Sequence, residues 1–317
     1  MPRLEAEGTD CYRLFHGVAE GRPGLMVDRY GPVVLVQVAS HLPLEAVEIE
    51  ALKAHFPHQP TVWTSRRGSR LEFVAQSMPG LWEARFSVRE LGLEFFLEFS
   101  KAHRDPQIFL DFRAAKRSLR ALIEQWDERP LSLLNLFAYT CSISCHALAS
   151  GADSVVSVDF SAGNLAWGQR NARRNRLREA SFLECDCVAA LWAWSGNRRA
   201  LARHKIRLGA GFELRQFSIV VVDPPAFSKG KYATVDLVND PETVFGPAWD
   251  VVAPGGLLVA ANNSAKVGRD EFEGRLRRMA AKRGAPIAWI ARVSPDLDFP
   301  SFDGEPPLKV AFCRKPS

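Results

Sequence analysis

Long apolar runs are absent from the 317-residue sequence: no apolar stretch approaches the roughly 18 residues that a membrane-spanning helix needs. The first residues, Met1-Pro2-Arg3-Leu4-Glu5, contain no apolar signal segment either. We therefore expect a cytoplasmic protein with no membrane partner, in which the six cysteines are reduced thiols. Internal repeats and low-complexity segments are also missing, and 47% hydrophobic with 24% charged residues is typical of a soluble globular protein.

A G-x-G-x-x-G motif is missing after residues 131–137, the strand where a dinucleotide-binding fold would carry it. A pyrophosphate needs glycines there, because the backbone must approach it closely. A cofactor without phosphates has no such requirement. An adenosyl-amino-acid cofactor therefore fits this chain better than NAD.

The sequence predicts an α/β fold in two parts, a small N-terminal α/β domain of residues 1–98 and a larger domain of residues 99–317. In the small part, a turn at residues 28–32 precedes a strand at residues 33–38, and a helix follows at residues 43–56. Further strands are expected at residues 61–64, 71–74 and 91–99.

Strands and helices alternate through the larger part, which indicates a doubly wound, largely parallel sheet. Helices are expected at residues 111–126, 162–176 and 272–283. Two further helices are expected to end at Ala149 and at Ala253. Strands are expected at residues 131–137, 155–159, 180–186, 218–222, 257–261, 287–293 and 308–313. One helix is predicted to end at Pro254-Gly255-Gly256, ahead of the strand at residues 257–261.

The most informative segment is Ser218 to Lys229. Its first five residues are rich in β-branched side chains and predict a strand buried on both faces. Asp223-Pro224-Pro225 then forms a rigid turn whose carbonyls stay free, because neither proline has an N–H group. With Phe227 and Lys229 following, this strand end is suited to holding a flat polar ring.

Polar residues also follow the neighbouring predicted strands, and the carboxyl ends of parallel strands form one edge where ligands bind. An acid at the position of Asp159 accepts the hydroxyls of a ribose in nucleoside-binding folds, and Asp186 could accept from an adenine amine. This series of polar residues at successive strand ends therefore predicts a nucleoside cofactor. Its members are Asn135, Tyr139, Thr140, Asp159, Asp186 and Asp223.

These segments resemble class I S-adenosylmethionine-dependent methyltransferases, and more narrowly the bacterial 23S rRNA large-subunit group with a DPPxF motif. The resemblance rests on residues 135–140 (NLFAYT), 155–159 (VVSVD), 171–177 (NARRNRL), 222–229 (VDPPAFSK) and 108–113 (IFLDFR). Residues 23–31 resemble the small central domain of that group. The resemblance implies a Rossmann-like, mostly parallel sheet whose last strand is reversed. The PUA domain that often precedes these enzymes is expected to be missing, since about ten residues stand before the match.

The resemblance also implies roles for individual residues, with S-adenosyl-L-methionine as the cofactor and no metal. Asp159 would hold the ribose, Asp186 the adenine, and Tyr139 and Thr140 the methionine part. The full cofactor set is Asp111, Arg113, Asn135, Phe137, Tyr139, Thr140, Asp159, Phe160, Asp186 and Asp223. The residues expected to face the methylated base are Asp223, Pro224, Pro225 and Phe227.

Two departures from the family pattern bear on function. Cys141-Ser142 replaces paired glycines in the cofactor loop, so side chains stand where the backbone usually approaches the cofactor. Members that methylate carbon 5 of cytosine carry a nucleophilic cysteine after the fifth strand, whereas this chain has Asn262-Asn263-Ser264. This difference favours direct transfer to a base nitrogen, which needs orientation more than a nucleophile.

The formal charge of +5 is unevenly distributed, because residues 170–215 contain eleven Lys and Arg but only four Asp and Glu. Arginine-rich surfaces suit phosphate, so we expect this segment to bind RNA. For His103 two interpretations stay open, a contact to substrate phosphate and a solvated linker. The predicted function is methylation of a base nitrogen in 23S rRNA. The alternatives are cytosine carbon-5 methylation, a non-catalytic RNA-binding or ribosome-assembly protein on this fold, and a small-molecule methyltransferase; a homodimer is left open.

Overall fold

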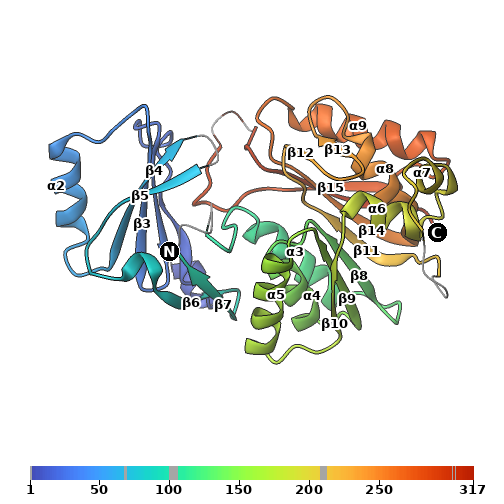
Figure 1. The fold of residues 1–317 in the computed structure, drawn as a ribbon, viewed down its shortest axis with the longest axis horizontal. Helices are drawn as coiled ribbons and strands as arrows, with labels where there is room; N and C mark the ends of the chain where they lie inside the picture. Colours follow the sequence, from blue (N-terminus) through green and yellow to red (C-terminus); the bar gives the residue numbers. More distant parts are fainter. Residues whose placement is uncertain (1, 68–69, 100–105, 208–212, 302, 304) are drawn as a thin grey trace. The chain divides into compact units, whose positions relative to one another are not determined.

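The computed structural model describes the chain except for residues 1, 68–69, 100–105, 208–212, 302 and 304. His103 and a small part of the basic segment therefore lie outside the described residues. The chain divides into two compact units (Figure 1). The first contains Met1–Arg113 with Pro295–Gly304, and the second contains Ala114–Ser294 with Glu305–Ser317.

The sequence places the domain boundary after residue 98, whereas the compact units divide after Arg113. The Gln107 side chain joins the later segment to the backbone of Glu98 through two hydrogen bonds, each of 2.8 Å. Buried Arg113 pairs with Asp296 and Asp298, which stand more than 180 residues later in the chain. These contacts assign residues 106–113 and a distant segment to the first unit.

The first unit is built on a five-stranded sheet with its strands in sequence order (Figure 1). β3 and β4 are parallel and the other neighbours are antiparallel. The crossover between β3 and β4 carries α2 (Ala46–His55), whose Leu52 packs with Val34 and Val36. The remaining elements are α1 (Pro2–Ala6), β1 (Cys11–Phe15), β2 (Leu25–Tyr30), β3 (Val33–Ala39), β4 (Thr61–Arg67), β5 (Arg70–Gln76), η1 (Leu81–Glu83), β6 (Arg85–Glu90) and β7 (Leu93–Glu98).

The second unit is built on a seven-stranded sheet in the order β10-β9-β8-β11-β14-β16-β15. The first five strands are parallel, and β16 runs antiparallel to both of its neighbours, so the predicted reversed last strand is confirmed. The strands are β8 (Ser132–Leu136), β9 (Ser154–Asp159), β10 (Ala180–Glu184), β11 (Phe217–Val222), β14 (Val252–Asn262), β15 (Trp289–Val293) and β16 (Lys309–Arg314). A separate hairpin is formed by β12 (Phe227–Lys229) and β13 (Thr234–Asp236).

Helices cover both faces of this sheet, as expected for a doubly wound fold (Figure 1). α6, α8 and α9 contribute to one large core with β8, β11 and β14, while α4 and α5 contact β8, β9 and β10. The helices are α3 (Arg113–Glu124), α4 (Ser142–Ala149), α5 (Ala162–Arg174), α6 (Cys187–Trp194), α7 (Arg198–Arg203), α8 (Glu242–Asp250) and α9 (Arg269–Lys282). Among the described residues, no helix is both long and apolar enough to cross a membrane.

Two local predictions are corrected. The predicted turn at residues 28–32 is mostly the end of β2, because Asp28 is buried inside a polar network that satisfies its carboxylate. Pro254-Gly255-Gly256 lies within β14, which begins at Val252, and Gly255 supplies a left-handed residue (φ +67°). The residues that follow the Asp-Pro-Pro turn, Phe227 to Lys229, form the short strand β12, which pairs with β13.

Candidate active site

The carboxyl edge of the larger sheet carries most of the predicted site residues. Along this edge the parallel strands lie in the order β10, β9, β8, β11 and β14. Asp159 and Asn262 are the last residues of their strands, and Asp223 directly follows β11. Asp186 follows β10 by two residues, and Tyr139 lies in the loop after β8. The polar strand ends thus form the continuous edge that the sequence predicts.

The loop between β8 and α4 is held in an unusual conformation. Phe137, Tyr139 and Cys141 all have positive φ angles, of 56°, 49° and 61°. Non-glycine residues rarely adopt this region, and such strain concentrates at functional sites. Three N–H groups anchor the loop: that of Phe137 donates to Cys187 Sγ (3.2 Å), that of Ala138 to the carbonyl of Val158 (3.0 Å) and that of Tyr139 to Asp159 Oδ2 (2.9 Å). The loop therefore has the tight path that glycines would adopt without strain.

Asp159 organises the centre of this edge. Besides the N–H of Tyr139, its carboxylate accepts the N–H of Ser161 (2.9 Å) and a side-chain N–H of Asn164 (3.3 Å). Burial raises the pKa of the Asp159 carboxyl above its usual value, and the hydrogen bonds from Ser161 and Tyr139 oppose that shift. Beside it, the ring of Phe160 is 76% exposed. A carboxylate next to an exposed aromatic ring suits a ribose with an attached flat base.

Asp186 has one oxygen committed to the protein and one oriented toward the β12–β13 hairpin. Oδ1 caps α6 by accepting the N–H groups of Val188 (3.0 Å) and Ala189 (3.1 Å). Oδ2 lies against Gly230, where a Cβ atom would come within 2.5 Å of it. The hairpin that follows the Asp-Pro-Pro turn is thus in contact with the residue predicted to hold the adenine.

The segment predicted to face the substrate base begins half-buried and becomes exposed. Asp223 is half-buried, Pro224 is buried and Pro225 is exposed. The ring of Phe227, the first residue of β12, is 57% exposed. The N–H of Leu237 fixes the turn by donating to the carbonyl of Ala226 (3.0 Å). An exposed aromatic ring on a hairpin fixed in this way is suited to stacking on a base.

Two other residues of the predicted cofactor set are buried inside the unit. Asn135 is fully buried, and its Nδ2 donates to Ser144 Oγ (2.9 Å) on α4. Thr140 is 2% exposed, and its carbonyl accepts from Asn171 Nδ2 (3.1 Å). Both residues shape the β8–α4 loop from within, and direct contact with a cofactor stays a prediction for them.

The sequence predicts that the Cys141 side chain stands where the loop backbone usually approaches the cofactor. In the structure this side chain is packed inside the protein instead. The thiol is 1% exposed and packs in a small core with Ala138, Leu165 and Phe182. Space for it comes from Gly168 on α5, where a Cβ atom would lie only 2.3 Å from Cys141 Sγ. The missing glycine of the loop is therefore matched by a glycine on the neighbouring helix, a relationship that sequence reasoning missed.

The end of β14 carries no thiol but has a buried amide. Asn262 is 1% exposed, and its Oδ1 accepts the N–H of Ser264 (2.8 Å). Its Nδ2 is buried with no hydrogen-bond partner in the part of the chain that the structure describes. The carbonyl of Ser264 accepts from buried Lys309 Nζ (2.6 Å), whose pKa is lowered by burial. Asn263, in contrast, is exposed.

The cysteines are poorly suited to nucleophilic addition. Burial raises the pKa of Cys141 to about 12, and it raises that of Cys145, Cys187 and Cys313 as well. Cys185 is half-buried, and burial beside Asp186 raises its pKa too. A thiolate is required for covalent addition to a pyrimidine ring, and burial disfavours the thiolate at each of these cysteines. Among the described residues, no group of three or more His, Cys, Asp and Glu is arranged to hold a metal.

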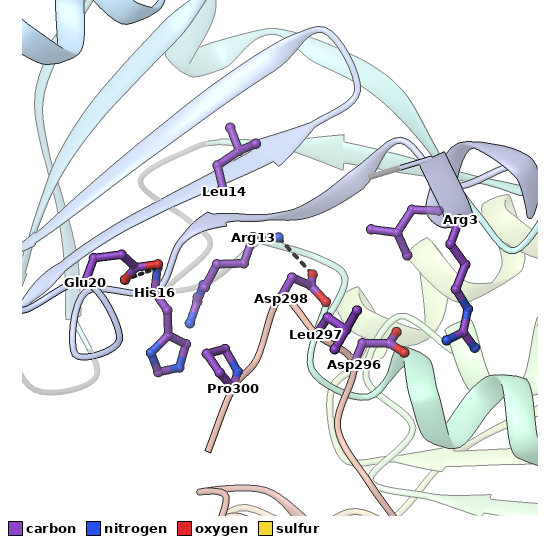
Figure 2. A pocket seen from close by; sticks show the side chains of 10 residues that line it. Arg3, Arg13, Leu14, His16, Glu20, Asp296, Leu297, Asp298 and Pro300 are labelled. Carbon is purple, nitrogen blue, oxygen red and sulfur yellow. Dashed lines mark hydrogen bonds between the residues drawn. The ribbon is translucent and has the colours of Figure 1, made fainter. Parts of the chain in front are cut away.

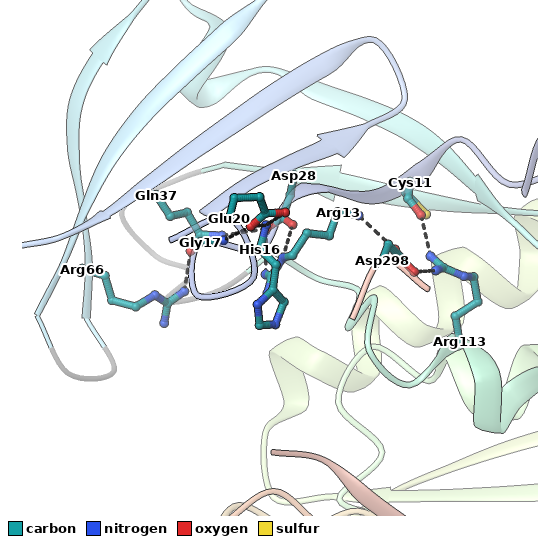
Figure 3. A network of polar contacts seen from close by, with 10 residues as sticks. All are labelled: Cys11, Arg13, His16, Gly17, Glu20, Asp28, Gln37, Arg66, Arg113 and Asp298. Atoms are coloured by element: carbon teal, nitrogen blue, oxygen red, sulfur yellow. Dashed lines mark hydrogen bonds and ion pairs between the residues drawn. The ribbon is translucent and has the colours of Figure 1, made fainter. Parts of the chain in front are cut away.

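Arg113 has protein partners at three of its nitrogens. Its Nε pairs with Asp296 (2.8 Å), one Nη with Asp298 (2.5 Å), and the other Nη with the carbonyl of Cys11 (3.0 Å; Figure 3). Arg113 is fully buried and belongs to the first unit, as does the half-buried Asp111. A role for either residue at the cofactor stays a prediction. No local pattern indicates the Arg113 pairs, because both carboxylates stand more than 180 residues away.

The fold is that of S-adenosylmethionine-dependent methyltransferases. Residues 65–314 match the S-adenosylmethionine-dependent methyltransferase family, and the chain belongs to it. It is 27% identical over 322 residues to the ribosomal RNA large subunit methyltransferase I of Pseudoalteromonas atlantica, covering 98% of this chain and 76% of that protein. The protein of the same name from Citrobacter koseri is 26% identical over 320 residues, covering 97% and 75%.

Solved structures share the fold. The SAM-dependent methyltransferase from Agrobacterium tumefaciens superposes with a TM-score of 0.69 at 20% identity, covering 98% of this chain and 91% of that one. A second structure, crystallised with SAH, gives a TM-score of 0.75 at 20% identity and covers 98% and 76%. The cofactor of this chain is thus S-adenosylmethionine, and the buried carboxylate of Asp159 beside the exposed Phe160 ring fits its adenosine.

Proposed function

We propose that this methyltransferase acts on large-subunit ribosomal RNA and transfers the methyl group to a base nitrogen. The absence of a thiol at the end of β14 is the observation that carries the choice of nitrogen. Covalent assistance would need a thiolate at that strand end, and burial raises the pKa of Cys141 and Cys187, which follow other strands of the sheet. The names of the two relatives above support an RNA substrate.

The exposed basic segment supports RNA as the substrate. All of its eleven Lys and Arg side chains are exposed, and they come from α5, α7 and the loops beside them. The α5 and α7 groups lie on opposite faces of the sheet, because α7 packs on α6 and α5 packs on α4. Exposed basic side chains of either group would neutralise phosphates and release their counterions, which supplies sequence-independent affinity. Binding of RNA by this segment and assembly into a homodimer both remain predictions, as does a cytoplasmic location.

The proposed roles follow from the edge of the sheet. S-adenosylmethionine supplies an electrophilic methyl group. Asp159 accepts the ribose hydroxyls and Asp186 Oδ2 the adenine amine, while Tyr139 borders the methionine part. Phe227 stacks on the base, and Asp223 accepts a hydrogen bond from an exocyclic amine and so orients the attacking nitrogen. The chain contributes orientation and exclusion of water rather than a covalent intermediate.

Cytosine carbon-5 methylation and a non-catalytic role are the competing proposals, and two measurements separate them. Mass spectrometry of rRNA nucleosides from a deletion strain should show loss of one N-methylated base; loss of 5-methylcytidine would overturn the proposed nitrogen chemistry. Calorimetry with S-adenosylhomocysteine tests catalysis itself, because a chain that does not bind it at millimolar concentration is not an active methyltransferase. The packing of Cys141 away from the loop removes the main argument for the non-catalytic alternative.

A further inference from the structure

Two charged groups that line a cavity in the first unit are satisfied inside the protein. Glu20 and Arg13 are part of the lining of this cavity of 220 Å³ (Figure 2). Both carboxylate oxygens of Glu20 accept backbone N–H groups, those of His16 and Gly17, and the Arg13 guanidinium pairs with buried Asp28 (2.8 Å). Charges that already have partners give a ligand little to bind, whereas exposed cations without an acidic partner can bind an anion.

The second unit has a run of such cations on α7 and directly after it. All of them are exposed, and within the residues that the structure describes no ion pair with an acid is found for any of them. No Asp or Glu stands between Asp186 and Glu213, so nearby residues of the sequence do not offset this positive charge. The run consists of Arg198, Arg199, Arg203, Lys205 and Arg207.

Ring contacts join this basic run to the β12–β13 hairpin. The imidazole of His204, the residue after α7, stacks on the Trp192 ring of α6, with 4.9 Å between the ring centres and 19° between the planes. The Tyr232 ring meets the same imidazole edge-on, with 6.2 Å between the centres and 81° between the planes. Tyr232 lies at the tip of the hairpin, between β12 and β13. The end of α7 and the tip of the hairpin are therefore neighbours in space.

The hairpin has one face turned to the core and one turned outward. Val235 is buried in the main core of the unit, and its partner across the hairpin, Ser228, is half-buried. Phe227 and Lys229 stand on either side of Ser228 in β12, so their side chains lie on the opposite face, and both are exposed. Two residues along a strand span roughly 7 Å. An aromatic ring and a lysine thus leave the backbone side by side on the outward face.

The hairpin adds two cations to the basic run. Lys229 and Lys231 are exposed, and in the described part of the chain neither ammonium group pairs with an acid. The Lys231 ammonium lies 5.1 Å from the centre of the Tyr232 ring. Surfaces that bind single-stranded nucleic acid combine cations with aromatic rings, because the cations neutralise phosphates while the rings stack on bases. An acidic protein segment would leave the Phe227 ring uncovered, so RNA is the better match.

We propose that the RNA strand beside the target nucleotide runs from Phe227 along the hairpin to α7. The basic residues of α5 lie on the other face of the sheet and do not contact this strand. The inference rests on the proposed function, since it names the path of the RNA that the enzyme would methylate. We call this path the hairpin–α7 surface, and it consists of Arg203, Lys205, Phe227, Lys229, Lys231 and Tyr232.

Two helix ends of the same geometry provide a matched pair of variants. Lys205 after α7 and Arg176 after α5 are both left-handed, with φ angles of 54° and 55°. In both, the N–H of the next residue donates back into the last turn of the helix at 2.9 Å. Glycine is favoured at such a position. Lys205→Gly and Arg176→Gly therefore each remove one exposed cation, and neither should lower the melting temperature.

Fluorescence anisotropy of the full chain with labelled single-stranded oligouridine, at several salt concentrations, tests the path. Lys205→Gly should weaken binding and reduce the slope of log K against log salt by about 0.7, the value for one phosphate of a single strand. Arg176→Gly should change neither quantity. Phe227→Leu should weaken binding about tenfold, equal to about 1.4 kcal/mol, and leave the slope unchanged because stacking on a ring involves no charge.

Three results would overturn the proposal. Equal losses in Lys205→Gly and Arg176→Gly would show that the position of the cation is irrelevant, and a loss in Arg176→Gly alone would place the RNA on the face of α5. Full affinity in Phe227→Leu, together with competition by polyglutamate as strong as that by unlabelled oligouridine, would show that the surface binds acidic chains in general.

The proposed function is tested separately on the unchanged chain, by calorimetry with S-adenosylhomocysteine and by rRNA methylation. A chain that is active in both, but whose Lys205→Gly variant binds oligouridine normally, loses the hairpin–α7 surface alone. A chain that binds oligouridine through this surface and methylates no rRNA loses the proposed function and keeps the surface.

Discussion

At the scale of single residues, the strained loop between β8 and α4 explains how this chain does without the family's glycines. Cys141 adopts a left-handed conformation and turns its thiol into the space above Gly168. A left-handed cysteine is less stable than glycine, but burial of the side chain offsets part of that cost. The two positions therefore act as a pair across the loop and α5.

This pairing predicts a specific coupling. Gly168→Ala should lower the free energy of unfolding by about 1–3 kcal/mol, because the new methyl group would overlap Cys141 Sγ. In a Cys141→Gly background the same change should lose most of that penalty, since the space is then empty. A double-mutant cycle by urea denaturation measures the difference. Equal costs in both backgrounds would show that the two residues do not compete for space.

Asp159 predicts a pH dependence of cofactor binding. Its pKa is raised by burial in the free protein, so the folded state holds the proton to a higher pH than an unfolded aspartate does. The free energy of unfolding of the free protein should therefore fall as pH rises between the two pKa values. Ribose hydroxyls stabilise the carboxylate, so affinity for S-adenosylhomocysteine should rise over the same interval.

Calorimetry at a series of pH values checks this expectation. Asp159→Asn should remove the pH dependence and also weaken binding of S-adenosylhomocysteine. Both carboxylate oxygens of Asp159 accept backbone N–H groups, from Tyr139 and Ser161, so the NH2 group of an asparagine would face one of these N–H groups. Asp127→Asn, at an exposed aspartate after α3, is the matched control. An unchanged pH profile in Asp159→Asn would assign the titration to another group.

At the scale of elements, the β12–β13 hairpin links the proposed adenine and base sites. Its tip contacts Asp186 at Gly230, and its first strand carries the exposed ring of Phe227. Gly230→Ala would bring a methyl group within 2.5 Å of Asp186 Oδ2 and 2.9 Å of the Ala233 carbonyl. We expect this change to weaken binding of S-adenosylhomocysteine by about tenfold, equal to about 1.4 kcal/mol.

Calorimetry on Gly230→Ala, with the melting temperature as a check on folding, tests that expectation. Gly274→Ala on α9 is the control, because its added Cβ would meet only the flexible end of the Arg278 side chain, at 3.3 Å. Full affinity in Gly230→Ala would mean that the hairpin moves freely and does not border the adenine site. A loss of affinity with an unchanged melting temperature would support direct contact.

The elements also show what a sequence pattern can and cannot predict. Alternating strands and helices predicted the larger sheet well, since a buried strand such as β11 has an unmistakable β-branched run. The strand at β2 was missed because Asp28 looks like a turn residue until Arg13 and Gln37 are placed beside it. Long-range partners of this kind leave no local signal, and the same holds for the space that Gly168 gives to Cys141.

At the scale of the whole molecule, two basic clusters differ in how far their charge is already neutralised. One cluster lies on α9 and the residue after it and consists of Arg275, Arg277, Arg278, Lys282 and Arg283. Three of these five pair with acids: Arg275 with Glu271, Lys282 with Glu242 and Arg283 with Asp250. On α7, Arg198, Arg199 and Arg203 are exposed, and no ion pair with an acid is found for them within the described residues. The α7 surface thus keeps its charge for a partner.

This contrast predicts how salt affects RNA binding. Arg198→Gln/Arg199→Gln should lower RNA affinity and reduce the slope of log K against log salt by about 0.7 to 0.9 for each phosphate that the protein no longer neutralises. Lys282→Gln/Arg283→Gln removes the same charge from exposed residues that already pair with acids and should have the smaller effect. Fluorescence anisotropy with an rRNA fragment at several salt concentrations gives both slopes. Identical slopes in the two variants would mean that RNA responds only to the net charge of the protein, and the α7 surface would then have no specific role.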